Sequence, residues 1–257
     1  MMHSPRFFSP EILPGSTAIG SVIDLPEAVF RHAVKVLRLR DGEEVSLFDG
    51  SGGEYRARLT GIGKSAASAE LLDWQPLERE APFAITLIQA VQAAEKMDWT
   101  VQKAVELGVA RIQPAESRRS VVRLSGDRAA KRIEHWQGVA IAACEQCGRN
   151  RVPEVAPLLS VEQALAATAT DELKLFFSPV GAVSLHELTP TARMTLLVGA
   201  EGGLDPAEEA AARVAGFVPV QLGPRVLRTE TAGLTALAAI HALWGDFKKA
   251  TGGNHHV

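Results

Sequence analysis

Two loops in the last quarter of the chain carry the residue types best suited to hold a small ligand. The first, Gly199–Gly203, follows the apolar run Met194–Val198, and the second, Gly223–Arg228, follows the apolar run Phe217–Leu222. Glycines let a backbone approach a ligand closely, and main-chain hydrogen bonds between apolar walls suit a flat heterocycle. The chain has no G-x-x-x-x-G-K-[ST] sequence, so a P-loop nucleotide site is not expected. Taken alone, the first loop is more simply a tight turn; the pair of loops is the more specific signal.

The elements around these loops predict that both loops meet at one edge of a sheet. Met194–Val198 and Phe217–Leu222 are short apolar runs of the kind found in buried strands. Asp205, Pro206 and Glu208 occupy the N-cap, N1 and N3 positions of a helix that starts after the first loop. Open α/β sheets bind ligands at the carboxyl ends of their parallel strands, which is where we expect the pocket.

The preceding segment has the strand–helix–strand order of a parallel sheet. Phe83–Val91 and Val109–Pro114 are apolar strand patterns, and Ala94–Gly108 between them has helical periodicity with a terminal glycine. Right-handed crossovers are expected for such units. Further along the chain we predict helices over 126–147 and Val161–Thr168, and a strand over Leu173–Phe177.

The first 74 residues predict a separate, β-rich domain with one helix. Strand patterns cover Thr17–Leu25, Glu44–Asp49, Glu54–Gly61 and Ser65–Trp74, and a helical stripe of Val29, Ala33, Val36 and Leu37 covers Pro26–Leu39. A polar, proline-containing linker follows. We therefore predict three segments: residues 1–74, the linker 75–82, and a second domain 83–257.

Composition bounds the class of protein. Apolar residues make up 46% and charged residues 22% of the 257 residues, which is ordinary for a soluble globular chain, and the N-terminus lacks the apolar core of a signal peptide. No apolar run is long enough to span a bilayer, so a cytoplasmic protein without membrane contact is expected. The two cysteines, Cys144 and Cys147, lie in a helical pattern without a second pair at zinc spacing. We interpret them as small buried thiols and expect no metal.

Positive charge is concentrated in one segment of an acidic chain. The formal net charge is −3, yet residues 111–151 contain nine Lys or Arg and four acidic residues. A local basic patch on an acidic protein is typical of a polyanion site, although scattered Arg and Lys are also common on solvated helix faces. The charges alone leave these two alternatives about equal.

Several motifs resemble one family of enzymes. LLVGAEGGL followed by LGPRVLRTETA is similar to the SPOUT methyltransferases, most closely to the 16S ribosomal RNA (uracil-N3)-methyltransferase family. EKMDWTVQKAVELGV, the Arg119-Ser120 pair and IAACEQCGRNRVPE resemble further signatures of that family in the expected order, and LFDGSGGEYRARL resembles its PUA-like N-terminal domain. Two departures are Ala200, where the family usually has proline, and Arg118, where it often has glutamate.

The resemblance implies an α/β fold, namely a SPOUT parallel-sheet domain with a C-terminal trefoil knot, preceded by a small β-rich PUA-like barrel. It also implies S-adenosylmethionine as cofactor, bound between the two loops. The cofactor-binding residues implied are Leu197, Gly199, Glu201, Gly202, Leu222, Gly223, Leu227, Arg228 and Thr231.

The implied reaction is methylation of N3 of uridine 1498 in 16S ribosomal RNA, either free or in the assembled small subunit. Candidate catalytic residues are Arg119, Glu145 and Arg149. Candidate RNA contacts are Arg6, Arg31, Lys35, Arg38, Arg123, Lys131 and Arg132. The helix expected over Thr229–Lys248 is apolar nearly all round, which predicts a homodimer. The alternatives are a SPOUT ribose 2′-O-methyltransferase and a non-catalytic RNA-binding assembly factor.

Overall fold

The computed structural model describes residues 4–12, 17–169, 172–178 and 182–247. The chain divides into two compact units. The first unit is Met1–Glu80 together with Cys144–Val152, and the second is Ala81–Ala143 together with Pro153–Val257. The first unit thus contains a segment from the middle of the chain in addition to the β-rich region that the sequence predicts.

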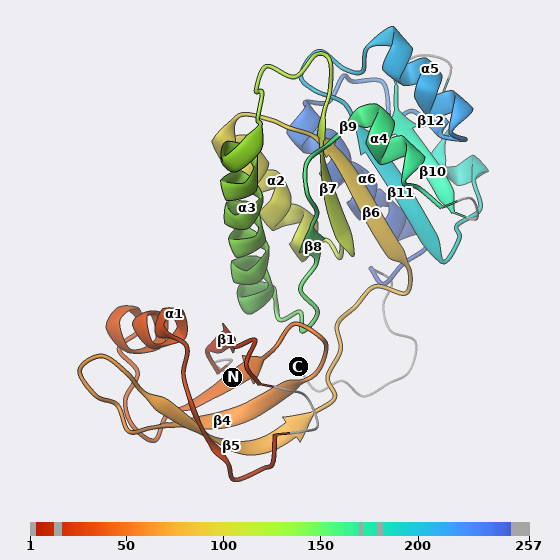
Figure 1. The fold of residues 1–257 in the computed structure, drawn as a ribbon. Helices are drawn as coiled ribbons and strands as arrows, with labels where there is room; N and C mark the ends of the chain where they lie inside the picture. The colour runs from red at the N-terminus through yellow and green to blue at the C-terminus, as the bar shows by residue number, and fades with distance from the viewer. Residues whose placement is uncertain (1–3, 13–16, 170–171, 179–181, 248–257) are drawn as a thin grey trace. The chain divides into compact units, whose positions relative to one another are not determined.

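The first unit is built on a five-stranded sheet with the order β1-β3-β4-β5-β2 (Figure 1). Its strands are β1 (Arg6–Phe8), β2 (Val22–Asp24), β3 (Glu44–Phe48), β4 (Glu54–Thr60) and β5 (Ser68–Gln75). β1 runs parallel to β3, and the other neighbours are antiparallel. Tyr55, Ala57 and Leu59 of β4 are buried while Arg56 and Arg58 are exposed, which is the alternation of a sheet with one face on the core.

The helix of the first unit departs from the predicted periodicity in its second half. α1 (Glu27–Phe30) continues as a π-helix, η1 (Arg31–Val36). Val29 and Ala33 are buried as predicted, but Val36 and Leu37 are 64% and 45% exposed, so that part of the prediction was wrong. A π-helix bonds each residue to the fifth rather than the fourth along the chain, which rotates later side chains away from the α-helical stripe.

The second unit contains a parallel sheet, as the sequence predicts, and this sheet has seven strands. The strands are β6 (Ala84–Ala90), β7 (Arg111–Glu116), β8 (Glu154–Val155), β9 (Leu159–Ser160), β10 (Leu173–Phe177), β11 (Arg193–Val198) and β12 (Val218–Val220). Of these, β8 and β9 were not predicted. Their order is β12-β10-β11-β6-β7-β8, with β9 paired to β7. β10 therefore lies between β11 and β12, and the carboxyl ends of these three strands lie side by side.

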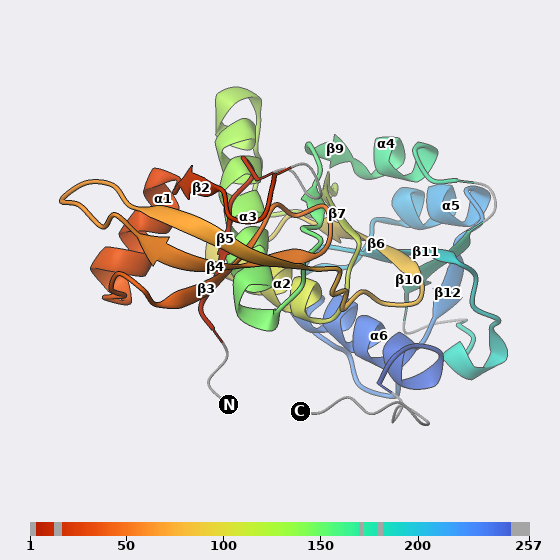
Figure 2. The same ribbon diagram turned by 90° about the horizontal axis from the view of Figure 1, so that it is seen from below.

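Helices cover both faces of this sheet (Figures 1 and 2). α2 (Ala94–Glu106) and α6 (Thr229–Leu243) pack together on one face, and α4 (Val161–Ala166) and α5 (Pro206–Val214) on the other. A 3₁₀ turn, η2 (Leu185–Glu187), precedes β11. The core is apolar, with Leu87, Leu196 and Leu237 fully buried.

The helix ends follow the capping rules that the sequence suggests. α3 (Gly126–Cys147) has the predicted bounds, and Gly148 after it has φ +87°, the left-handed conformation that stops a helix. Asp205 and Glu208 form the predicted capping box of α5. α6 ends at Leu243, whereas the predicted end, Lys248, lies outside the described residues. None of the helices in the described part of the chain combines the length and hydropathy of a membrane span.

Candidate functional site

A cavity of about 260 Å³ lies in the second unit, at the carboxyl ends of β10, β11 and β12. Both glycine-containing loops contribute to its wall, as the sequence predicts. The lining residues are Phe177, Ser178, Val198–Glu201, Gly203, Leu204, Val220–Leu227, Thr229 and Ala232. Most of the lining side chains are apolar, and the polar ones are those of Ser178, Glu201, Gln221, Arg225 and Thr229.

The first loop is a compact turn with no space at its first residue. The Gly203 N–H donates to the Ala200 carbonyl at 2.8 Å. A Cβ on Gly199 would lie 2.8 Å from both Gly203 C and Leu204 N, which are backbone atoms and cannot move aside cheaply. A Cβ on Gly202 would lie 3.4 Å from Arg119 Cδ, an ordinary contact. Gly199, unlike Gly202, has no room for a side chain, and Gly203 needs glycine for a different reason, its left-handed φ of +74°.

The predicted cofactor residues fall into two groups. Those that line the cavity are Gly199, Glu201, Leu222, Gly223 and Leu227. The others lie around it: Leu197 is fully buried in the core, and the Gly202 carbonyl accepts from Arg119. Arg228 is the N-cap residue of α6, and its carbonyl accepts from the Thr231 N–H at 2.9 Å. Their roles in cofactor binding stay predictions.

Sequence reasoning missed Thr229, which lines the cavity and is 6% exposed. Its hydroxyl donates to the Gly199 carbonyl at 2.5 Å, so it links the first loop to the start of α6 directly after the second loop. Its position immediately after Arg228 was the signal available in the sequence.

Arg119 lies in the loop after β7 and reaches the first glycine-containing loop. Its Nη1 donates to the Gly202 carbonyl at 2.7 Å. The preceding residues are held by Glu208, a fully buried carboxylate that accepts from Ser117 Oγ at 2.9 Å and from the Arg118 N–H at 2.8 Å. Because Glu208 also accepts from the Asp205 N–H, it fixes the loop after β7 to the beginning of α5.

The other two candidate catalytic residues belong to the first unit. Arg149 is 4% exposed and binds Glu80 through two hydrogen bonds, of 3.1 Å from Nε and 2.5 Å from Nη2. Glu145 Oε1 accepts from the Phe8 N–H at 2.9 Å, and burial raises the pKa of the Glu145 carboxyl above its usual range. These contacts hold the end of α3 and β1 within the first unit. Catalytic roles for Glu145 and Arg149 stay predictions.

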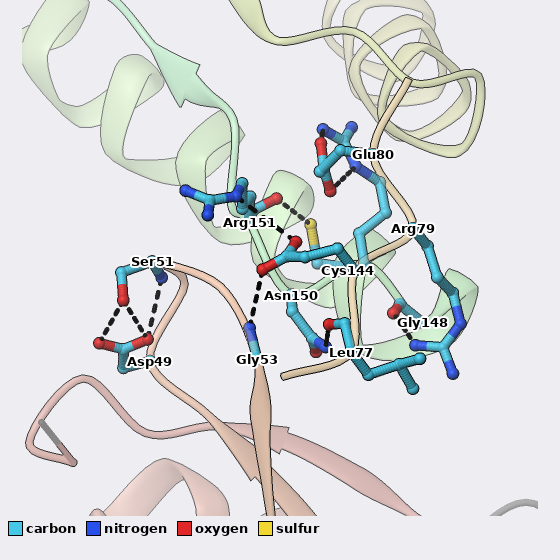
Figure 3. A network of polar contacts seen from close by, with 12 residues as sticks. Asp49, Ser51, Gly53, Leu77, Arg79, Glu80, Cys144, Gly148, Asn150 and Arg151 are labelled. Atoms are coloured by element: carbon cyan, nitrogen blue, oxygen red, sulfur yellow. Dashed lines mark hydrogen bonds and ion pairs between the residues drawn. The ribbon is translucent and has the colours of Figure 1, made fainter. Parts of the chain in front are cut away.

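A polar network connects the middle segment of the chain to the rest of the first unit (Figure 3). Asn150 is fully buried and donates to the Leu77 carbonyl at 2.6 Å, and Arg79 donates to the Gly148 carbonyl at 2.7 Å. Cys144 Sγ lies 3.7 Å from the Arg151 carbonyl oxygen. Burial raises the pKa of the Cys144 thiol to about 12, so it is an inert buried thiol as predicted, while Cys147 is half-buried.

Three basic side chains lie together on the solvent side of α3 in the second unit. Arg128, Lys131 and Arg132 line a shallow depression with Asp127 and His135. Arg123 is elsewhere engaged: its guanidinium donates to the carbonyls of Ser117 and Arg118 and pairs with Glu116.

The candidate RNA contacts of the first unit differ in their exposure and in the contacts that they already make within the protein. The side chain of Arg6 is 10% exposed; it pairs with Glu54 and donates to Asn150 Oδ1 at 2.6 Å. Arg31 is exposed and pairs with Glu27, and Lys35 donates to the Lys64 carbonyl at 3.1 Å. Arg38 is exposed and has φ +59°, in the left-handed region. Among the described residues no group of three or more His, Cys, Asp or Glu is arranged to hold a metal ion.

Comparison with known proteins defines the class. The family model described as "RNA methyltransferase domain" matches residues 79–241, and the model "RNA methyltransferase PUA domain" matches residues 25–72. The parallel-sheet unit and the β-rich unit are therefore those of an RNA methyltransferase with a PUA domain.

Relatives narrow the class to one family. The Ribosomal RNA small subunit methyltransferase E of Bacillus subtilis is 33% identical over 218 residues, 81% of this chain and 85% of that protein. The protein of the same name from Buchnera aphidicola subsp. Schizaphis graminum is 32% identical over 229 residues, 89% of this chain and 93% of that protein. The chain belongs to the ribosomal RNA small subunit methyltransferase E family, which confirms the predicted resemblance.

Two solved structures agree with this assignment. The Neisseria gonorrhoeae member, bound to S-adenosyl methionine, is 45% identical, with a TM-score of 0.89 over 96% of this chain and all of that chain. A Legionella pneumophila putative methyltransferase, also with its bound cofactor, is 34% identical, with a TM-score of 0.90 over 95% of this chain and all of that chain. The predicted fold class is confirmed by these neighbours, while the trefoil knot stays a prediction.

Proposed function

We propose that this chain transfers a methyl group from S-adenosylmethionine to N3 of a uridine in 16S ribosomal RNA, the uridine numbered 1498. The observation that carries the proposal is the cavity between the two glycine-containing loops, in a chain that is 45% identical to a relative bound to S-adenosyl methionine. The names of the relatives support ribosomal RNA of the small subunit as substrate.

The residues of the cavity fit this cofactor. Leu222, Val226 and Leu227 supply apolar surface for a flat adenine ring, and the exposed loop backbones supply hydrogen-bonding groups for its edge. Gly199 leaves no space for a side chain because a Cβ there would meet the loop's own backbone at Gly203 and Leu204, so glycine is needed to form the compact turn that lines the cavity. When bound, S-adenosylmethionine supplies an activated methyl group on a sulfonium.

Arg119 is the residue of this site best suited to assist the reaction. Uridine N3 carries a proton and is a poor nucleophile until that proton leaves, and its loss places negative charge on O2 and O4 of the base. The Arg119 guanidinium is held at the Gly202 carbonyl of the first loop, where a cation would stabilise that charge. The target base would have to leave any stack to reach a buried methyl group.

Binding of the RNA is assigned to exposed basic side chains. On the second unit these are Arg128 and Lys131, which are exposed, together with the half-buried Arg132 beside them; Arg123 is engaged with backbone carbonyls of its own loop. On the first unit Arg31, Lys35 and Arg38 are exposed. Cationic side chains that neutralise phosphates would supply a salt-dependent, sequence-independent part of the affinity.

The experiment is a methyl-transfer assay with labelled S-adenosylmethionine, using free 16S ribosomal RNA and assembled small subunits side by side. The RNA is then digested to nucleosides. We expect label in 3-methyluridine. Label in a 2′-O-methylated nucleoside would identify a ribose methyltransferase, and tight RNA binding without any transfer would identify a non-catalytic assembly factor.

A further inference from the structure

A buried polar network lies beneath the two loops of the second unit. Its centre is Thr229, the first residue of α6, whose hydroxyl donates to the Gly199 carbonyl at 2.5 Å. Gln89 Nε2 donates to the same hydroxyl oxygen at 3.1 Å, and the side-chain amide of Gln92 lies 3.2 Å from it. Thr100 Oγ1 lies 3.2 Å from the Gln92 amide and extends the network to α2.

The members of this network are polar residues in an apolar interior. Gln89 and Thr100 are fully buried, and Gln92 is 1% exposed. Burying an amide is unfavourable unless its hydrogen bonds are satisfied, and leucine or methionine would fill the same space without that requirement. These side chains do not cap or stabilise a local element, because Gln89 bonds to Thr229, which is 140 residues further along the chain. The network instead ends at the Gly199 carbonyl, which it reaches through the Thr229 hydroxyl.

The orientation of one peptide group follows from this contact. In a trans peptide, the carbonyl of one residue and the N–H of the next point in opposite directions. With the Gly199 carbonyl held by Thr229, the Ala200 N–H must point away from Thr229, and both Gly199 and Ala200 line the cavity. Glycine has more backbone freedom than any other residue, so the Thr229 hydroxyl restricts a peptide plane that the Gly199 side of the loop would otherwise hold less tightly.

We propose that Thr229 and Gln89, with Gln92 behind them, are positioning residues for the cofactor. Gln89 orients the Thr229 hydroxyl, the hydroxyl fixes the Gly199 carbonyl, and the fixed peptide presents the first loop to the ligand in one conformation. The same hydroxyl joins the first loop to the residue that follows the second, so both sides of the cavity are set together. This inference rests on the proposed function, in that S-adenosylmethionine is the ligand.

The test compares the affinity for S-adenosylmethionine, measured by titration calorimetry, across hydroxyl variants. Thr229→Val keeps the shape of the side chain but removes the hydroxyl, and we expect about tenfold weaker binding, the equivalent of one lost hydrogen bond. Thr229→Ser restores the hydroxyl and should bind within about threefold of the parent. Thr195→Val is the matched control, because Thr195 is 2% exposed on β11, the strand that leads into the first loop, and is outside the network.

Gln89→Met separates positioning from direct contact, because Gln89 is not among the residues that line the cavity. We expect it to weaken binding about fivefold. If the two residues act through one hydroxyl, the Gln89→Met/Thr229→Val double variant should bind no more weakly than Thr229→Val alone. In turnover, each variant should raise KM for the cofactor and leave kcat at saturation near the parent value, a split that general destabilisation would not produce.

The outcomes distinguish this inference from the proposed function. A parent protein that binds no S-adenosylmethionine would contradict the proposed function. A parent that binds it, with folded Thr229→Val and Gln89→Met variants that bind equally well, would overturn the positioning role alone. Additive losses in the double variant would also overturn it, because the glutamine would then act independently of the hydroxyl. Thermal unfolding of each variant is measured first, and binding is then compared at a temperature at which all variants are folded.

Discussion

Arg119 connects the loop after β7 to the first glycine-containing loop through a single 2.7 Å hydrogen bond to the Gly202 carbonyl. In the reaction we propose, the Arg119 charge is needed only as the uracil becomes anionic, so Arg119→Ala should lower the single-turnover methylation rate by about 100-fold or more. Cofactor affinity should stay near the parent value. Arg118→Ala is the matched control: Arg118 is adjacent, but its side chain is 57% exposed and pairs with Glu162 and Asp205. A parent-like rate in Arg119→Ala would assign the role elsewhere, first to Arg228.

Glu145 predicts a pH dependence of stability. Burial raises the pKa of its carboxyl above 4.5, so the folded protein holds this proton more tightly than the unfolded chain. The resulting stabilisation is full below pH 4.5 and is lost as the pH rises through the folded pKa. Glu145→Gln keeps an oxygen for the Phe8 N–H but cannot ionise. Denaturant unfolding should therefore show the variant gaining stability relative to the parent between pH 4 and pH 8.

A constant difference between the two proteins over this pH range would contradict the effect of burial on Glu145. It would mean that the Glu145 carboxyl has the same pKa in the folded and the unfolded protein. Any difference in stability between the parent and Glu145→Gln would then come from packing alone.

Single residues were predictable where their role is local. Asp205, Glu208, Gly108 and Gly148 follow capping rules that operate within a few residues, and the structure has them as predicted. Thr229 was missed because its partner Gln89 lies 140 residues away, and no local pattern records such a contact. Glu208 was recognised only as a helix cap, since its bonds to Ser117 and Arg118 span about 90 residues.

At the scale of the element, α3 carries the clearest electrostatic prediction. Replacing Arg128, Lys131 and Arg132 together by alanine should weaken RNA binding about uniformly across sequences. It should also reduce the slope of log affinity against log salt by about two to three, because fewer counterions are released from the phosphates. The Lys103→Ala/Arg213→Ala double variant is the control on other helices of the second unit. An unchanged slope in the triple variant would mean that this face of α3 is merely solvated.

Elements with a simple period were predictable, and those with an irregular one were not. The strands β6, β10 and β11 are mostly apolar and mostly buried, because parallel strands are covered on both faces. The prediction that Val36 and Leu37 lie on the buried side of the helix was wrong because η1 is π-helical. The sequence carries no marker for the switch from α-helical to π-helical hydrogen bonding.

For the whole molecule we predict a homodimer that forms through α6. One side of α6 is buried within the unit, whereas Thr235, Ala238, Ala239 and Ala242 are half-buried or exposed. Sedimentation at micromolar concentration should give about twice the 27.5 kDa chain mass. Ala238→Glu should yield a monomer because it would bury a charge, and Ala130→Glu on the exposed side of α3 should not. A monomeric parent would contradict the interface.

The division of the chain shows the limit of sequence reasoning at this scale. The PUA domain and the methyltransferase domain were predicted from a change in pattern near residue 75 and from the resemblance. The inclusion of Cys144–Val152 in the first unit was not, because it depends on Arg149 binding Glu80 and Asn150 binding Leu77 across some 70 residues. Such long-range polar contacts have no periodicity.

In the reaction we propose, the cavity between the two loops directs methylation of N3 of one uridine. N3-methylation blocks base pairing, so reverse transcription of treated 16S ribosomal RNA should stop at a single uridine. The stop should require both the parent protein and S-adenosylmethionine. It should be lost with Gly199→Ala, whose Cβ would meet loop backbone at 2.8 Å, and kept with Gly202→Ala, where the Cβ meets only Arg119 at 3.4 Å. No stop with the parent protein would contradict N3-methylation, and an equal stop with Gly199→Ala would contradict the role of the cavity in it.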